Sequence, residues 1–328
     1  MSYGPYCLGL RFSGGSKLIG SKSKWRKNRL LRAIALPCLS VIARTRAGIR
    51  TGIPWLSPRR LIRYGRLILA KHGGKTFIGQ IPMTGCLMEL EPNHWITHSW
   101  YVRADYETNV IAGLRRFLHP GMICMDIGAN AGLFTLFMAR RVGDGGKVYA
   151  FEPTAATFQL LEKNIALNVL PNVMSENVAV TEQTGTVEFH IGPPSLCVYN
   201  SISAVMHPSA KDGQFLRVIV PAISIDDYCA ARRITRVDLV KIDVEGAELQ
   251  VLKGMQRVLK ENWQIVLLIE FYRVTAAACG TSVDVMAEWL GAMDFQLFLI
   301  AANGRLRPIK GAIPANGEMV WAARIAVP

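Results

Sequence analysis

The stretch Met122-Ile-Cys-Met-Asp126-Ile-Gly128-Ala-Asn130-Ala-Gly132 decides the fold of this 328-residue chain. An apolar run ends in an acid, a loop of small residues follows, and apolar residues at helical spacing then continue to position 141. A second apolar run, residues 147–151, ends in Glu152. The pattern predicts a strand–helix–strand unit with a carboxylate at the tip of each strand.

The small-residue loop is suited to a cofactor that contains a nucleoside. Small residues let the backbone approach a ligand closely, and an acid at the second strand tip can accept hydrogen bonds from both ribose hydroxyls. A dinucleotide fingerprint needs glycine at the first, third and sixth loop positions. Those positions hold Gly128, Asn130 and Leu133 here, and no lysine follows the glycines as in a P-loop.

The spacing acid-x-Gly-x-Asn-x-Gly instead resembles the nucleoside loop of class I S-adenosylmethionine (SAM) methyltransferases, with Asn130 in place of the usual middle glycine. SAM has no pyrophosphate to hold, but it carries an amino-acid tail and a sulfonium. We therefore expect SAM rather than NAD as the cofactor. Asp126 is expected to orient the ammonium group of SAM, directly or through water.

The net charge of +14 is confined to one end of the chain. Residues 1–88 contain 17 Lys and Arg and no Asp or Glu, whereas the rest contains 21 basic and 24 acidic residues. A nearly neutral domain argues against tracking of a phosphate backbone, so nucleic acid is disfavoured as a partner. We expect a basic N-terminal extension, residues 1–75, followed by a methyltransferase domain, residues 76–328.

The extension contains one strong helix signal. Ser57 is expected as the N-cap, Pro58 lies in the first turn, and a helix over residues 57–70 ends before two glycines. Arg59, Arg63 and Arg66 share one of its faces. Such a helix could lie on an anionic membrane surface, dock a partner, or present a solvated basic face with its apolar face on the core.

Cysteine usage and hydropathy bear on the compartment. The seven cysteines form no CxxC pair, which predicts a reducing compartment with no disulfide framework and no zinc site. No run of about 18 uninterrupted apolar residues occurs, so no membrane-spanning helix is expected. We expect a cytoplasmic protein, with peripheral membrane contact through residues 1–75 as an open alternative. The sequence does not give the oligomeric state.

Strand and helix signals alternate along the second part of the chain. Strands are expected at residues 76–81, 85–90, 122–127, 147–152, 173–180, 185–191, 216–221, 237–242, 264–269, 295–300 and 318–324. Helices are expected at residues 106–118, 132–142, 155–168, 225–230, 247–259 and 283–293. This order predicts an α/β protein whose mostly parallel sheet is covered by helices. A turn-rich loop joins the last two strands, which allows an antiparallel edge strand.

A second group of acids is expected at the same edge of this sheet. The strand 237–242 runs into Asp243 and Glu245, and the next strand ends in Glu270. Ligands of open α/β sheets bind at the carboxyl ends of the strands, so these acids should face the same crevice as Asp126 and Glu152. A rim carboxylate, with Asp243 as the expected one, could act as general base towards an acceptor hydroxyl. Alternatively, Asp243 and Glu270 could hold a divalent cation, although we assign no metal site.

Several blocks in the same order resemble the FkbM family of SAM-dependent methyltransferases. They are His119-Pro-Gly121, Asp126-Ile-Gly-Ala-Asn-Ala-Gly132, Val148-Tyr-Ala-Phe-Glu152-Pro153, Asn177-Val-Ala179, Ser224-Ile-Asp226-Asp227 and Val240-Lys-Ile-Asp243-Val-Glu245-Gly-Ala-Glu248. The resemblance covers roughly residues 76–300. It implies a class I methyltransferase fold with a Rossmann-like sheet and helices on both faces. It also implies O-methylation of a hydroxyl on a small molecule, sugar or glycan.

The resemblance also implies roles for individual residues. Asp126, Gly128, Asn130 and Gly132 would line the methionine side of SAM, Glu152 would bind the ribose, and Ala179 would lie near the adenine. Asp243 and Glu245 would sit by the acceptor, with Glu270 as a further rim acid. The competing hypothesis is a catalytically idle methyltransferase-fold module that docks to a membrane or to nucleic acid through its basic segment.

Overall fold

The computed structural model describes residues 58–193, 200–202, 215–314 and 316–324. The chain divides into two compact units, Met1–His72 and Gly73–Pro328. Most of the predicted extension, including the expected N-cap Ser57, lies outside the described residues. What is described of it is the helix α3 (Pro58–Gly73), which begins at its proline.

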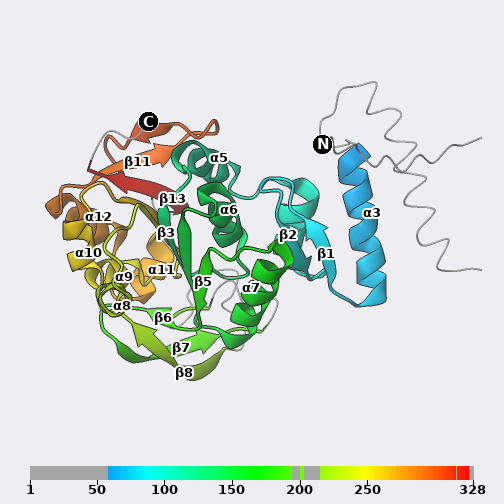
Figure 1. Cartoon of the computed structure of the whole chain (residues 1–328), viewed down its shortest axis with the longest axis horizontal. Coiled ribbons are helices and arrows are strands. Elements are labelled where there is room, and N and C mark those ends of the chain that lie inside the picture. Colours follow the sequence, from blue (N-terminus) through cyan, green and yellow to red (C-terminus); the bar gives the residue numbers. More distant parts are fainter. Residues whose placement is uncertain (1–57, 194–199, 203–214, 315, 325–328) are drawn as a thin grey trace, which may run out of the picture. The chain divides into compact units, whose positions relative to one another are not determined.

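The second unit is built on an eight-stranded sheet (Figure 1). Its strands, in spatial order, are β12 (Leu306–Pro308), β11 (Gln296–Ile300), β13 (Asn316–Ala323), β10 (Val266–Tyr272), β9 (Leu239–Ile242), β3 (Ile123–Ile127), β4 (Lys147–Phe151) and β5 (Val173–Glu176). The strands from β10 to β5 are parallel neighbours. The edge strand β12 is antiparallel to β11, and β13 is antiparallel to both of its neighbours. The predicted α/β fold with a mostly parallel sheet and an antiparallel edge strand is confirmed.

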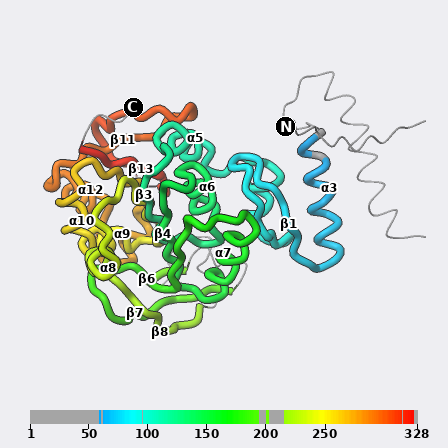
Figure 2. Tube along the Cα trace, in the orientation of Figure 1, coloured from blue at the N-terminus to red at the C-terminus, as the bar shows by residue number. Residues whose placement is uncertain are grey.

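Helices cover both faces of this sheet because successive side chains of a strand point to opposite faces. Met125 and Ile127 of β3 pack in a core with α8 (Ile225–Arg232), α9 (Glu248–Lys253), α10 (Gln256–Glu261) and α12 (Val283–Ala292). Asp126, between them, meets Thr135 of α6 (Leu133–Val142) on the other face. On that face α5 (Thr108–Phe117) packs on Trp321 through Phe117, and α7 (Ala155–Asn168) packs on Ala150. Figure 2 shows the yellow and orange helices gathered apart from the green ones.

Two smaller sheets flank the large one. The strands β1 (Phe77–Gln80) and β2 (Leu87–Leu90) form the predicted antiparallel hairpin. A three-stranded sheet has the order β6 (Ala179–Val180), β8 (Leu216–Ile223), β7 (Gly185–Ile191). The single strand expected at 173–180 is therefore wrong, because the chain leaves the large sheet after β5. The side chain of Asn177 donates to the carbonyls of Glu152 and Pro153 at 2.9 and 3.0 Å, which fixes this change of direction.

The helix expected at 247–259 is also interrupted, at Gly254 between α9 and α10. A Cβ atom at this position would lie 2.1 Å from the Thr181 carbonyl oxygen, so the chain needs glycine for this close approach. Three short helices have no counterpart in the sequence expectations. They are α4 (Trp95–Thr97), the π-helix η2 (His98–Arg103) and α11 (Arg273–Ala278).

We predict that Gly254→Ala lowers the free energy of unfolding by about 1–3 kcal/mol, because the added methyl group forces backbone apart. The matched control is Gly291→Ala in α12, where a Cβ meets no atom within 4 Å. This control should raise stability by up to about 1 kcal/mol through helix propensity. Urea denaturation monitored by circular dichroism measures both changes. Equal effects of the two substitutions would contradict the packing argument.

Candidate active site

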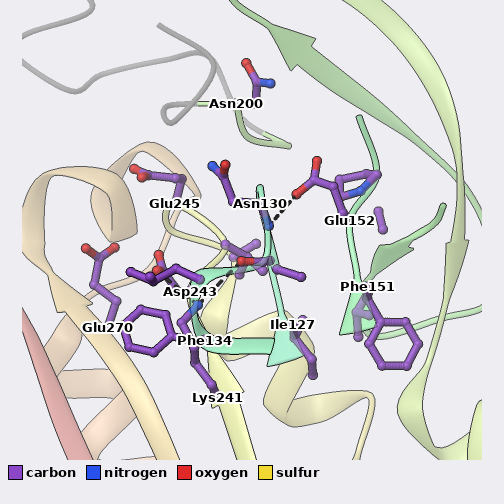
Figure 3. A pocket seen from close by; sticks show the side chains of 18 of the residues that line it. Ile127, Asn130, Phe134, Phe151, Glu152, Asn200, Lys241, Asp243, Glu245 and Glu270 are labelled. Carbon is purple, nitrogen blue, oxygen red and sulfur yellow. Dashed lines mark hydrogen bonds and ion pairs between the residues drawn. The ribbon is translucent and has the colours of Figure 1, made fainter. Parts of the chain in front are cut away.

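A cleft opens at the carboxyl ends of the central parallel strands (Figure 3). It holds about 1010 Å3 of space free of protein atoms, part of it open to solvent. Its walls include the loop after β3, the end of β4, the β6 strand, the tip of β9 and the acid within β10. The corresponding residues are Gly128, Ala129, Asn130, Glu152, Val178, Ala179, Val180, Asp243, Glu245 and Glu270.

The loop after β3 depends on left-handed backbone conformations. Gly128 has φ 77°, and a Cβ there would lie 1.9 Å from the carbonyl oxygen of Asp243. Asn130 has φ 49°, a conformation that Asn adopts more readily than most side-chain-bearing residues. The Asn130 side chain also accepts a hydrogen bond from the Ala131 amide at 2.7 Å. Asparagine can therefore replace the usual middle glycine without changing the loop.

Glu152 lies at the tip of β4 with both carboxylate oxygens in use. One oxygen accepts from the Asn130 amide at 3.1 Å and the other from the Thr154 amide at 2.9 Å. Burial raises the pKa of Glu152 to about 7. Because each carboxylate oxygen has two lone pairs, both can still accept a hydrogen bond from a ligand hydroxyl. The cleft beside Glu152 has the apolar wall Val178, Ala179 and Val180. An acid beside an apolar wall fits the ribose and adenine of an adenosyl group.

Two of the residues expected to line the cofactor pocket do not reach it. Asp126 is fully buried on the α6 face of the sheet, where Thr135 Oγ1 donates to its Oδ2 at 2.5 Å. The alternation of side chains along β3 aims this carboxylate beneath the loop instead of into the cleft. Gly132, with φ 95°, faces α7, since a Cβ there would lie 2.6 Å from Leu161 Cδ1. In the structure Asp126 supports the loop from below and Gly132 allows close packing of α6 on α7, so a role of either residue towards SAM stays a prediction.

Lys241 is the partner that holds Asp126 in place, and its role was not expected. Its Nζ lies 3.4 Å from Asp126 Oδ1, 3.2 Å from Asp243 Oδ2 and 3.4 Å from the Gly128 carbonyl oxygen. The ring centroid of Phe134 lies 5.3 Å from the same atom. Although burial lowers the pKa of Lys241, the charges of Asp243 and Asp126 outweigh this effect and raise that pKa above its usual value. Lys241 thus ties the tips of β3 and β9 together.

The structure brings the three rim acids together. Asp243, Glu245 and Glu270 each offer a carboxylate oxygen, and these atoms lie within 4.8 Å of one another. Burial, with the charge of Asp243 as the next cause, raises the pKa of Glu245 and of Glu270 well above the usual range. One oxygen of Glu270 is buried and has no hydrogen-bond partner among the described residues. Three hard oxygen ligands at this separation could also hold a divalent cation.

The tip of β9 is braced by Glu248. One of its oxygens accepts from the amides of Val244 and Gly246, both at 3.1 Å. Glu248 is the first residue of α9. This bracing fixes the backbone that carries Asp243 and Glu245.

Further cleft residues come from the segment before β3. Trp100 of the π-helix and Tyr106 both line the cleft, with ring centroids 6.1 Å apart. Burial and the nearby charge of Asp243 raise the pKa of Glu107 to about 8. The Tyr106-Glu107 pair gave no periodic signal in the sequence.

The chain matches a known family of protein domains. Residues 126–297, more than half of the chain, match the family described as the methyltransferase FkbM domain. The chain belongs to the FkbM methyltransferase family. Its domain is a SAM-dependent methyltransferase domain, and its cofactor is SAM.

Two curated methyltransferases are similar to part of the chain. Methyltransferase sdnD of Sordaria araneosa is 30% identical over 165 residues, which cover 43% of this chain and 62% of the relative. Hexuronic acid methyltransferase AglP of Haloferax volcanii is 28% identical over 161 residues, which cover 49% of this chain and 61% of the relative. The chain thus spans about three fifths of the length of these relatives. A solved SAM-dependent O-methyltransferase from Thermotoga maritima is 14% identical, with a TM-score of 0.37 and coverage of 68% of this chain and 66% of that one.

No helix in the described part of the chain is both long and apolar enough to cross a bilayer.

We predict that Glu152→Ala weakens the binding of S-adenosylhomocysteine about 10- to 100-fold, because a charged hydrogen bond contributes about 1.5–3 kcal/mol. Glu152→Gln, which keeps one acceptor oxygen, should weaken this binding by a smaller factor. Titration calorimetry measures the dissociation constants. Glu188→Gln, an acid of β7 with 51% side-chain exposure, is the control and should bind normally. An unchanged Kd for Glu152→Ala would remove Glu152 from the cofactor site.

The buried carboxyls also predict a pH dependence of stability. Burial raises the pKa of Glu107 to about 8 and the pKa values of Glu152 and Glu248 to about 7, from 4.5. Each group binds its proton more tightly in the folded chain. Their combined contribution to the free energy of unfolding therefore falls as pH rises from about 4.5 to about 8.

Thermal denaturation of the ligand-free protein across this pH range tests the sign. The wild-type midpoint should decline more steeply with pH than that of Glu107→Gln, which cannot ionise at this position. Parallel profiles for the two proteins would show that Glu107 keeps its ordinary pKa.

Proposed function

We propose that this FkbM methyltransferase transfers the methyl group of SAM to a hydroxyl on a small molecule, sugar or glycan. The proposal is carried by one observation. The acids Asp243, Glu245 and Glu270 share a cleft with the Glu152 carboxylate and the loop after β3. The relatives add support, since one is named as a hexuronic acid methyltransferase and another as a 2-O-methyltransferase.

In this proposal one end of the cleft binds SAM. Glu152 accepts hydrogen bonds from the ribose hydroxyls, and the wall around Ala179 covers the adenine. The backbone of Gly128 and Asn130 lies against the methionine part. SAM supplies an electrophilic methyl group at its sulfonium. Since Gly128 closely approaches the Asp243 carbonyl, the methionine part lies next to the rim acids.

Glu270 is the candidate general base. A hydroxyl must lose its proton as its oxygen attacks a methyl group, and a base works best when its pKa lies near the working pH. Burial raises the pKa of Glu270 above that of an ordinary carboxyl, which strengthens it as a base, and its buried oxygen has no hydrogen-bond partner among the described residues. Asp243 already forms an ion pair with Lys241, which suits it to orienting the acceptor. Glu245 is the alternative base, because its pKa is also raised.

The charge of this end of the cleft restricts the acceptor. Glu107, Asp243, Glu245 and Glu270 interact with one another electrostatically, and the ammonium group of Lys241 is already paired with two carboxylates. A negatively charged acceptor would oppose the ionisation of acids whose pKa values burial already raises, and it would find no free cation in the described part of the cleft. We infer that the methylated hydroxyl belongs to a molecule without a negative charge near the reacting group. The hexuronic acid named for one relative would thus be disfavoured here.

A divalent cation at the three acids is the alternative source of hydroxyl activation. It would neutralise the same carboxylates and lower the pKa of a bound hydroxyl. Activity that persists in EDTA favours the carboxylate base. Activity that is lost in EDTA and restored by Mg2+ favours the cation.

The acceptor is identified most directly by mass spectrometry of metabolites from cells with and without the gene, searching for species that differ by one methyl group. Related neutral, cationic and anionic sugars should then be compared as acceptors for the purified protein. The account expects turnover of the neutral member to exceed that of the anionic one. No species differing by a methyl group, together with no turnover of any acceptor, would favour a catalytically idle domain.

With the acceptor in hand, we predict that Glu270→Gln lowers kcat about 10²- to 10⁴-fold, the contribution of a general base. The affinity for S-adenosylhomocysteine should stay within twofold of wild type, which separates this effect from misfolding. Asp243→Asn should raise KM for the acceptor more than it lowers kcat. Undiminished turnover in Glu270→Gln would show that another group takes the proton.

A further inference from the structure

The helix α3 presents an unusual exposed face. At 100° per residue, Ile62 and Leu69 fall on one side of the helix and Leu67 falls on the opposite side. Leu67 is buried, with 1% of its surface exposed, whereas Ile62 is 61% exposed and Leu69 is 54% exposed. The helix thus exposes two large aliphatic side chains on the side opposite its buried leucine.

Arginines border this apolar stripe. Arg59 and Arg66 lie three and four residues from Ile62, on the same side of the helix, and both are exposed. No acidic residue occurs anywhere in residues 1–88, so this part of the chain has no acid to neutralise them locally. The exposed face therefore combines apolar side chains with positive charges that no acid within residues 1–88 neutralises.

We propose that this face of α3, formed by Arg59, Ile62, Arg66 and Leu69, docks on an anionic lipid surface. Ile62 and Leu69 enter the boundary between headgroups and acyl chains, and the two arginines bind lipid phosphates. A helix with aliphatic side chains on one face and basic side chains beside them is the pattern of an interfacial helix. Single-stranded nucleic acid is recognised through basic and aromatic side chains, so the two aliphatic residues favour lipid.

The length of α3 agrees with this orientation. Sixteen helical residues extend about 24 Å. A bilayer core is about 30 Å thick, so α3 is too short to cross it but long enough to lie in the interface. The contact would keep the protein at a membrane surface and does not depend on the chemistry proposed for the cleft.

Vesicle co-sedimentation of the full chain tests the proposal. Phosphatidylcholine vesicles are compared with vesicles that also contain phosphatidylglycerol. Binding is expected only to the anionic vesicles and should weaken as salt is added. Because a basic residue near an anionic surface contributes about 1 kcal/mol, Arg59→Gln/Arg66→Gln should weaken binding about thirtyfold. Ile62→Ser/Leu69→Ser should weaken it about tenfold or more, through loss of apolar burial.

The matched control changes one basic and one aliphatic side chain on the second unit. Lys260→Gln/Val285→Ser replaces an exposed lysine and a 47% exposed valine there, and it should bind vesicles as wild type does. Binding of S-adenosylhomocysteine confirms that each variant is folded. Equal binding to both kinds of vesicle would overturn the proposal, as would binding to anionic vesicles that the α3 variants leave unchanged. The proposal would also be overturned if RNA displaced the wild-type protein from vesicles and the α3 variants no longer bound RNA.

Discussion

The ion pairs of Lys241 are the interaction on which the site depends. One buried ammonium joins Asp126 at the end of β3 to Asp243 just beyond β9. Removing one partner of a buried pair typically costs about 3–5 kcal/mol, because the remaining charge is left uncompensated in a medium of low dielectric. The same contacts hold the loop of Gly128 against the tip of β9, and so they set how close a cofactor in that loop can lie to the rim acids. The contacts of Lys241 thus stabilise the fold and also position the candidate site.

That network also explains the electrostatics of the cleft. Lys241 compensates the two aspartates it touches, and the remaining acids around it have raised pKa values because burial disfavours their charged forms. A cluster of this kind costs stability in the ligand-free protein. Such arrangements are common where a group must exchange protons near neutral pH. The excess of acid over base at the acceptor end is therefore better understood as a requirement of function than of folding.

Much of this arrangement was accessible from the sequence, and the exceptions have physical causes. The strand tips and the loop could be placed because acids and small residues end apolar runs. The direction of the Asp126 side chain could not be predicted, because a strand that is buried on both faces lacks the alternation of apolar and polar residues that distinguishes its two faces. Lys241 has a sequence signal of its own, because a lysine inside an apolar strand needs carboxylates nearby. The break at Gly254 and the cleft role of Trp100 arise from contacts between distant segments, which local patterns do not encode.

The central claim is that one network places a cofactor loop and an acidic rim around the same reaction centre. The crystal structure of the protein with S-adenosylhomocysteine tests it most directly. The account predicts ribose hydroxyls within hydrogen-bonding distance of Glu152, adenine against Ala179, and the sulfur atom facing Asp243 and Glu270. A ribose away from Glu152, or a sulfur atom turned from the rim acids, would contradict it.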